Sequence, residues 1–378
     1  MRIPRGALAL SAVFVAATTL VAVRVTAGAS TPATAPQHVT TITLASAHAY
    51  QPKAQPGTTD DYHCTVLDPH VRTNSYILSS QFRPGSAEDH HAALFLVPPN
   101  IAAQARRDHT VNKSWTCFGE AALPGTTLAQ FLKSPFLSVW APGHGADVLP
   151  KGTGIPLPAG SLVIIQVHYN LLVGHKPVKD SLVLHTVPMT KATLPLNLDL
   201  TLAPPDVPCP AGVTGPLCDR AAAVANQGAR FGQSAMDYIS GIEEMCGNDP
   251  VNPPVGDSTS CTSTVGSAGY VVRTQTHMHL LGVSFSMVLD PGTPKQQTLL
   301  DVPHYNFHDQ KAYDLAKPIA VAKGDTVKVT CTYDPTLAQE LPSLRSVPPH
   351  FITWGDGSSD EMCIGLMWTS KVLPPKAS

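Results

Sequence analysis

Short apolar stretches bounded by turn-forming residues recur from about residue 57 onward. A first series comprises "SYILSSQF", "HAALFLVPP", "SLVIIQVHYN" and "DSLVLHTV", which end near Gly, Pro, Asn or Asp. A second series comprises "LNLDLTL", "YVVRTQTHMHLLGVSFSMVL", "DTVKVTCTYD" and "CIGLMWTS". Two sets of strands in blocks of about 150 residues predict an all-β protein with two tandem β-sandwich, jelly-roll-like domains. We interpret "PKGTGIPLPAG" as a turn-forming stretch.

The break between the two series lies near "VPMTKATLP". We assign residues 57–187 to the first sandwich and residues 188–375 to the second. The second sandwich carries an insertion at about 205–262, which holds four cysteines and the Ala-rich segment "DRAAAVANQGARFGQSAMDYISGIEEM". We expect this segment to be helical, with Asp219 as its N-cap.

The N-terminus has the features of an export signal. Two arginines precede the apolar run Ala7–Val23, and "AGA" fits a cleavage site, so residues 1–29 are predicted to be a signal peptide. The alternative is an uncleaved membrane anchor, because the apolar run approaches the length of a membrane span. Residues 30–56 are rich in Ala, Thr and Pro and are predicted to be a flexible lead-in. We therefore expect a secreted or cell-envelope protein that contacts a membrane only if the segment is retained.

Composition narrows the class of protein. The net charge is −2 and only 14% of residues are charged, which argues against a nucleic-acid partner. Eight cysteines in an exported chain predict four disulfides, and the absence of a C-x-x-C pair argues against a thiolate zinc site. The residues alone leave 105 possible pairings.

Three groups stand out among the 16 histidines: the pair His90–His91, His168 in "IIQVHYN", and His277 with His279 in "THMHLLG". On a strand, residues i and i+2 share a face, so His277 and His279 could bind one metal ion. The alternative is a pair of buried histidines hydrogen-bonded to backbone carbonyls. Neighbouring residues on a regular strand point to opposite faces, so His90 and His91 need a bulge or different ring nitrogens to reach one ion.

Several motifs occur in order between about Asp61 and Thr369: "DDYHC", "HHAALF", "WTC", "LPKGTGIPL", "IQVHYN", "THMHLLG" and "GSSDEMC". Together they resemble the copper type II, ascorbate-dependent monooxygenases, a family that includes peptidylglycine alpha-hydroxylating monooxygenases and dopamine beta-hydroxylases. The resemblance implies two copper ions per chain, with ascorbate as reductant and O₂ as co-substrate. The implied ligands of the first copper are His90, His91 and His168, and those of the second are His277, His279 and Met362.

The ligand types agree with that chemistry. Hydroxylation of a C–H bond by O₂ needs two external electrons. Each copper ion supplies one electron, because its oxidation state changes by one. A thioether favours Cu(I), whereas the rival metal zinc seldom takes a methionine, so Met362 favours copper. On composition alone Met362 would be an ordinary core residue.

The resemblance also implies the disulfides Cys64–Cys117 and Cys331–Cys363. The simplest pairing of the remaining cysteines is Cys209–Cys218 and Cys246–Cys261, which would fasten the insertion. The resemblance implies no insertion at this place, so this segment departs from the family pattern.

Departures from the family bear on the substrate. Peptidylglycine enzymes hold the substrate carboxylate with an arginine where this chain has Gln275, and Ile364 and Leu366 replace the family's Asn and Tyr. Arg273 is near enough in sequence to take over that role. Gln166 is retained two residues before His168, and we take Gln166 and Gln275 as candidate catalytic residues.

These features predict a copper-dependent monooxygenase that hydroxylates a small, rather apolar substrate. The first alternative is a non-catalytic copper-binding protein on the same fold. The second is a secreted β-sandwich recognition module, stabilised by zinc.

Overall fold

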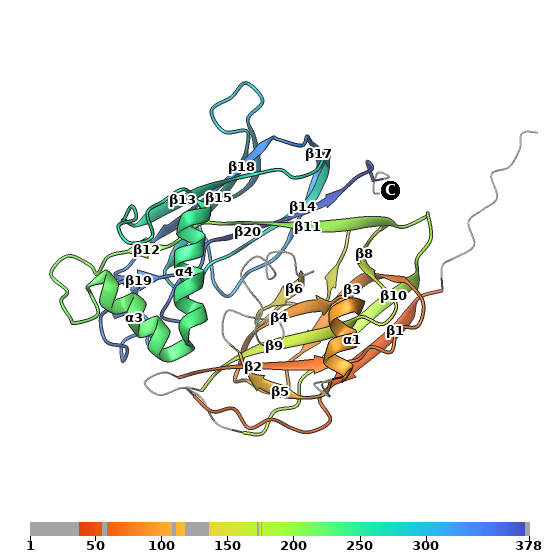
Figure 1. Ribbon diagram of the computed structural model, residues 1–378, viewed down its shortest axis with the longest axis horizontal. Coiled ribbons are helices and arrows are strands. Elements are labelled where there is room, and N and C mark those ends of the chain that lie inside the picture. Colours follow the sequence, from red (N-terminus) through yellow and green to blue (C-terminus); the bar gives the residue numbers. More distant parts are fainter. Residues whose placement is uncertain are drawn as a thin grey trace, which may run out of the picture. The chain divides into compact units, whose positions relative to one another are not determined.

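The computed structural model describes residues 38–54, 59–107, 111–117, 136–171, 174 and 176–374. The predicted signal peptide lies outside the described residues. Among the described residues, strands far outnumber helices and form several sheets, which confirms the all-β prediction (Figure 1). In the described part of the chain, no helix combines the length and the apolar character needed to cross a membrane.

The first sandwich packs two largely antiparallel sheets around one apolar core. One sheet contains, in spatial order, β1 (Thr40–Ala45), β10 (Ser181–Pro188), β3 (Ser75–Arg83) and β8 (Thr153–Leu157), with β7 (Asp147–Val148) beside β3. The other contains β5 (Ser114–Thr116), β2 (Asp60–Leu67), β9 (Leu162–Asn170), β4 (Asp89–Val97) and β6 (Phe136–Trp140).

The second sandwich has the same plan around a second apolar core. Its sheets contain β11 (Leu194–Leu202), β20 (Ile364–Ser370), β14 (Gly269–His277) and β17 (Tyr313–Val321), and β13 (Ser258–Thr264), β18 (Thr326–Tyr333), β15 (Gly282–Leu289) and β16 (Gln297–Val302). A separate short ladder pairs β12 (Asp206–Val207) with β19 (Ile352–Thr353). Because β11 also pairs with β8, one sheet runs from the first sandwich into the second. The exact domain limits remain a prediction.

The turn prediction for "PKGTGIPLPAG" is confirmed only at the two ends of the stretch, because its middle forms the strand β8. Pro156 is opposite Tyr76 of β3, whereas β11 pairs with β8 only at Thr153 and Gly154. At Pro156, β8 therefore pairs with a strand on one side only. On the other side no hydrogen bond is lost through the missing N–H of proline.

The described residues contain the helices α1 (Pro99–Arg107), α3 (Arg220–Phe231), α4 (Gln233–Met245) and α5 (Leu337–Glu340). The predicted N-cap is confirmed, since the Asp219 carboxylate accepts the Ala222 N–H at 2.9 Å. Gly232 has a φ of 89° and separates α3 from α4, so the Ala-rich segment forms two helices that pack together next to β19 (Figure 1).

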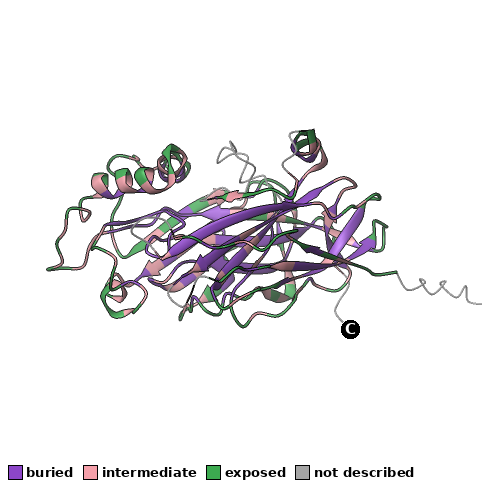
Figure 2. Ribbon diagram, turned by 90° about the horizontal axis from the view of Figure 1, so that it is seen from below, coloured by how far each residue is buried: buried purple, intermediate pink, exposed green. Residues whose placement is uncertain are grey.

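The eight cysteines form the disulfides Cys64–Cys117, Cys209–Cys218, Cys246–Cys261 and Cys331–Cys363. Cys64–Cys117 anchors the segment after β5 to β2, and Cys331–Cys363 joins β18 to the start of β20. Cys246–Cys261 ties the end of α4 to β13. Figure 2 shows that the strands are mostly buried, while exposed residues gather on the helices and loops.

Candidate metal centre

A β-bulge brings His90 and His91 to one place. On β4, Asp89 pairs with Tyr169 and His91 with His168, so His90 is an extra residue without a partner across the ladder. The two histidine side chains are thereby released from the strict alternation of a regular strand. The prediction that adjacent histidines need a bulge to meet is confirmed.

The ring nitrogens of the first histidine group have the spacing of metal ligands. The Nδ1 atom of His168 lies 3.3 Å from Nδ1 of His90 and 3.2 Å from Nδ1 of His91. With metal–nitrogen bonds of about 2.0–2.1 Å and tetrahedral angles, two ligand nitrogens are roughly 3.3 Å apart. Two of the distances between these nitrogens match that value, and the ligand atoms of all three residues lie within 4.8 Å of one another, which is the spacing of a metal site.

His168 is held in the orientation that directs Nδ1 toward the other two rings. Its Nε2 donates to the Asp60 carboxylate at 2.9 Å, which leaves the lone pair on Nδ1. Its ring stacks on Tyr62 with 4.2 Å between centroids, and the Tyr62 hydroxyl donates to the Asp356 carbonyl. Asp60 also accepts hydrogen bonds from the Ser358 hydroxyl at 3.1 Å and the Ser358 N–H at 3.3 Å.

The second histidine group is oriented through its other nitrogens. Nδ1 of His277 is 2.6 Å from the Gln310 side-chain oxygen, and Nδ1 of His279 is 3.0 Å from the Asp360 carbonyl. If each Nδ1 carries the proton and donates it, the Nε2 lone pair is left for a metal ion. His277 ends β14 and His279 lies beyond it, yet their ring centroids are 5.1 Å apart.

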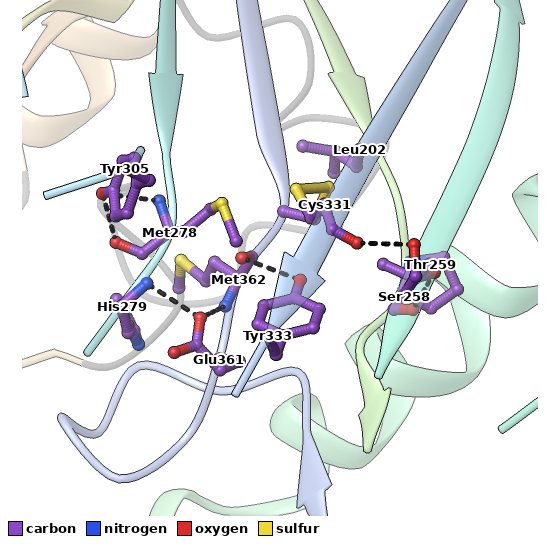
Figure 3. Close-up of a disulfide and its surroundings, with 12 residues drawn as sticks. Leu202, Ser258, Thr259, Met278, His279, Tyr305, Cys331, Tyr333, Glu361 and Met362 are labelled. Atoms are coloured by element: carbon purple, nitrogen blue, oxygen red, sulfur yellow. Dashed lines mark hydrogen bonds between the residues drawn. A yellow bond between two sulfur atoms is a disulfide. The ribbon is translucent and has the colours of Figure 1, made fainter. Parts of the chain in front are cut away.

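Met362 belongs to a segment that is fixed to His279. The buried Glu361 carboxylate accepts the backbone N–H groups of His279 at 2.8 Å and Met362 at 3.3 Å. The Tyr333 hydroxyl donates to the Met362 carbonyl at 3.2 Å, and the neighbouring Cys363 is bonded to Cys331 (Figure 3). The thioether is therefore carried by a backbone that is restrained on both sides.

Both groups meet at one cavity of about 90 Å³. The rings of His91 and His277 have centroids 5.9 Å apart, and those of His91 and His279 are 6.4 Å apart. The cavity lining includes one histidine of the first group, both histidines of the second group and Met362: His91, His277, His279 and Met362. Most of the remaining lining is aliphatic or aromatic.

The electrostatics keep these imidazoles neutral. Burial lowers the pKa of His90 and of His279 to about 4. Burial also lowers the pKa of His91, His168 and His277, and neighbouring imidazoles add to the effect at His91 and His168. Neutral imidazole is the form that binds metals, so the groups are ready to act as ligands at neutral pH.

The polar candidates for substrate binding occupy different places. Gln166 lines the cavity, together with Ile364 and Leu366. Gln275 instead supports the histidine shell, because its Nε2 donates to the Gln310 carbonyl at 2.7 Å. The catalytic roles of both glutamines remain predictions.

Arg273 does not serve as a substitute for the missing carboxylate clamp. It is buried and its guanidinium contacts Asp147 at 2.7 Å, Asp314 at 2.5 Å and the Val148 carbonyl. Its charge is already paired with two carboxylates, which lie on β7 and β17. The expectation that Arg273 binds a substrate carboxylate is therefore wrong.

Four residues of this region were missed by sequence reasoning: Asp60, Gln310, Glu361 and Phe307. Asp60 is the first residue of "DDYHC" and Glu361 lies inside "GSSDEMC", so membership of these motifs was a usable signal. Phe307, whose ring centroid is 5.0 Å from that of His90, and Gln310 lie in a loop without any recognisable pattern.

Comparison with known proteins finds a family match within the second sandwich. Residues 257–369 match the family model described as copper type II ascorbate-dependent monooxygenase, C-terminal domain. This range contains His277, His279 and Met362, and it confirms the resemblance seen in the motifs. No curated protein matches the chain.

Solved structures add little. The chain is similar to a structure of allantoicase at 8% identity, covering 73% of this chain and 74% of that chain with a TM-score of 0.18. It is also similar to a structure of infectious bursal disease virus Gx strain at 7% identity, covering 88% and 72%, with a TM-score of 0.19. TM-scores this low establish no shared fold.

Proposed function

Taking residues 257–369 as the C-terminal domain of the copper type II ascorbate-dependent monooxygenases, we propose that this protein hydroxylates a C–H bond of a small apolar substrate. The reaction uses O₂ and an ascorbate-type reductant. The protein acts outside the cytoplasm, in agreement with its four disulfides.

The observation that carries this proposal is the meeting of two histidine groups and a methionine at one apolar cavity. A protein that only stored copper would not need a largely apolar cavity beside its ligands. A zinc site would not need Met362, because thioethers are soft ligands that favour Cu(I).

Bound copper would supply the electrons and the O₂ chemistry, one electron from each of two ions. The residues of the chain have separate roles in this scheme. His90, His91 and His168 hold one ion, and Asp60 fixes the ring of His168. His277, His279 and Met362 hold the other, with Gln310 fixing the ring of His277. The apolar wall binds the substrate and keeps bulk water from the reacting C–H bond.

The wall favours an apolar substrate over a carboxylate. Ile364 and Leu366 line the cavity where peptidylglycine enzymes have polar residues, and Arg273 is occupied by Asp147 and Asp314. A buried carboxylate without a cationic partner would lose several kcal/mol on entering such a cavity, roughly the cost of an unpaired buried charge.

The test is a product screen on purified, copper-loaded protein with ascorbate and O₂. A panel of small apolar compounds is incubated, and mass spectrometry detects products that gain one oxygen atom together with consumption of O₂. We expect such a product from at least one compound. Two bound copper ions without any hydroxylated product would favour the non-catalytic copper-binding alternative.

His168→Ala tests the assignment of the first histidine group as a copper site. Bound copper should fall from two ions toward one, and hydroxylation should be lost, because the first histidine group loses its central nitrogen. The control is His304→Ala, which changes an exposed histidine outside both groups and should retain both ions and turnover. A His168→Ala protein with two ions and full turnover contradicts the assignment.

A further inference from the structure

The insertion at about 205–262 reaches the cavity through α4. Tyr238 of α4 is buried and belongs to the cavity lining. On the same helix, Ile239 and Ile242 form a small apolar cluster with Leu202 and Trp354, and Met362 packs against this cluster. The insertion therefore contacts both the cavity and the predicted methionine ligand.

The two helices of the insertion are fastened to β12, to β13 and to the segment before β20. Cys246, at the end of α4, is bonded to Cys261 of β13. Arg230 of α3 donates to the fully buried Asp360 carboxylate at 2.6 Å, two residues before Met362. Arg220 of α3 contacts Asp206 of β12 and donates to the Pro250 carbonyl at 2.9 Å. With a disulfide and two ion pairs holding it, this helical pair is a fixed wall.

The size of the cavity bounds the group that it can enclose. Its volume is about 90 Å³. A dry apolar protein cavity of about 150 Å³ holds one benzene molecule. The cavity therefore accommodates a group of a few carbon atoms, and the phenol ring of Tyr238 occupies space that a larger substrate would need.

We propose that the insertion forms the substrate-selecting wall of the cavity, and that Tyr238 is the residue that restricts it to small aliphatic groups. This inference rests on the proposed function, because it names the substrate class for the same site. It assigns a role to a segment that the motifs of the family do not include. Removal of the Tyr238 phenol ring should allow a compound with one aromatic ring to enter the cavity.

The experiment measures binding in the absence of turnover. The full chain is loaded with copper and kept without reductant, and the partitioning of tert-butanol and toluene is measured by headspace gas chromatography. In Tyr238→Ala, the affinity for toluene relative to tert-butanol should rise about tenfold or more, because the enlarged cavity can enclose one or more additional carbon atoms of toluene. Tyr238→Leu should raise this ratio less, and it serves as the readout if Tyr238→Ala does not fold.

Two matched variants separate cavity size from general loosening. Tyr238→Phe keeps the ring and should leave the ratio unchanged. Ala223→Gly loosens α3, which contributes no residue to the cavity lining, and should also leave the ratio unchanged. An unchanged ratio in both Tyr238→Ala and Tyr238→Leu overturns the inference, as does a wild-type protein that binds neither compound.

The outcome is independent of the oxygenase test. If the ratio responds to Tyr238 but no compound is ever hydroxylated, the selecting wall is supported and the proposed reaction fails. If hydroxylation occurs but Tyr238→Ala and Tyr238→Leu bind and convert the same small compounds in the same ratio as the wild type, the reaction is supported and the selecting wall is refuted.

Discussion

Asp60→Asn should weaken metal binding by the first histidine group while leaving the second group nearly unchanged. The Asp60 carboxylate is buried and accepts the Nε2 proton of His168 at 2.9 Å. The substitution keeps the shape of the side chain and removes its charge. His168 then loses the partner that fixes its tautomer and makes Nδ1 a better donor to a metal ion.

The expected size of the effect follows from this contact. Loss of a partner that orients a metal-bound histidine typically costs about 10- to 100-fold in metal affinity. That range corresponds to about 1.4–2.7 kcal/mol. Asp60 also accepts two hydrogen bonds from Ser358, and loss of the charge should lower the free energy of unfolding by about 1–3 kcal/mol.

Competition with a Cu(I) chelator measures the two affinities separately, and chemical denaturation measures the stability. The matched control is Asp61→Asn, which changes a buried aspartate at the next position of β2. Asp61 accepts from the Tyr50 hydroxyl at 2.8 Å and the Lys53 N–H at 2.7 Å, so its variant should lose stability but bind both ions normally.

An Asp60→Asn protein that binds both copper ions with wild-type affinity would refute the reasoning, because His168 would then need no carboxylate partner. Equal weakening at both groups would also refute it, since the effect would be a general loss of structure rather than a change at His168.

Further outcomes are expected elsewhere. Met362→Leu should cost less than about 1.5 kcal/mol of stability but lose Cu(I) at the second group and abolish hydroxylation; normal copper content and turnover would disprove the ligand role. Glycine-extended peptides should bind roughly 10²-fold more weakly than to an enzyme with a carboxylate clamp, because Arg273 is already ion-paired, and efficient hydroxylation of such a peptide would contradict this. Burial lowers the pKa of His63 from 6.5 to about 4, so the unfolded state takes up a proton first as pH falls, and the free energy of unfolding drops between these pH values by about 1.4 kcal/mol per pH unit. His63→Phe, which keeps a ring against Tyr50, should remove that part of the pH dependence when denaturation is measured at a series of pH values. An unaltered pH dependence would show that His63 does not titrate in this range.

Strand patterns were sufficient to predict the two sandwiches, because buried strands bounded by turn residues leave a clear trace in sequence. The helical insertion was also predictable, since Asp219 and the Ala-rich run give both a start and a composition. The strand β8 was missed because its glycines and prolines are typical of turns. Pairing with β3 overrides that local preference, and no local pattern encodes such a long-range contact.

The histidines that the sequence singled out do lie close together in the structure, but the geometry that brings them together was not predictable. Adjacent histidines indicated that a bulge was needed, yet only the register of β4 against β9 places it at His90. Gln310 and Tyr238 carried no signal, because each acts through a contact between segments far apart in the chain. Gln310 reaches His277 from a loop, and Tyr238 reaches the cavity from the insertion.

The segment Trp354–Cys363 physically connects the two histidine groups. Its Ser358 binds Asp60, which orients His168, while its Asp360 carbonyl accepts a hydrogen bond from His279 and its Met362 lies at the cavity. A displacement of this segment would therefore disturb ligands of both groups at once. Arg230 of the insertion holds the same segment through Asp360, so substrate contacts with the insertion and the positions of the ligands are mechanically linked. In the function that we propose, selection of the substrate and alignment of the predicted metal ligands thus both depend on this one restrained segment of backbone.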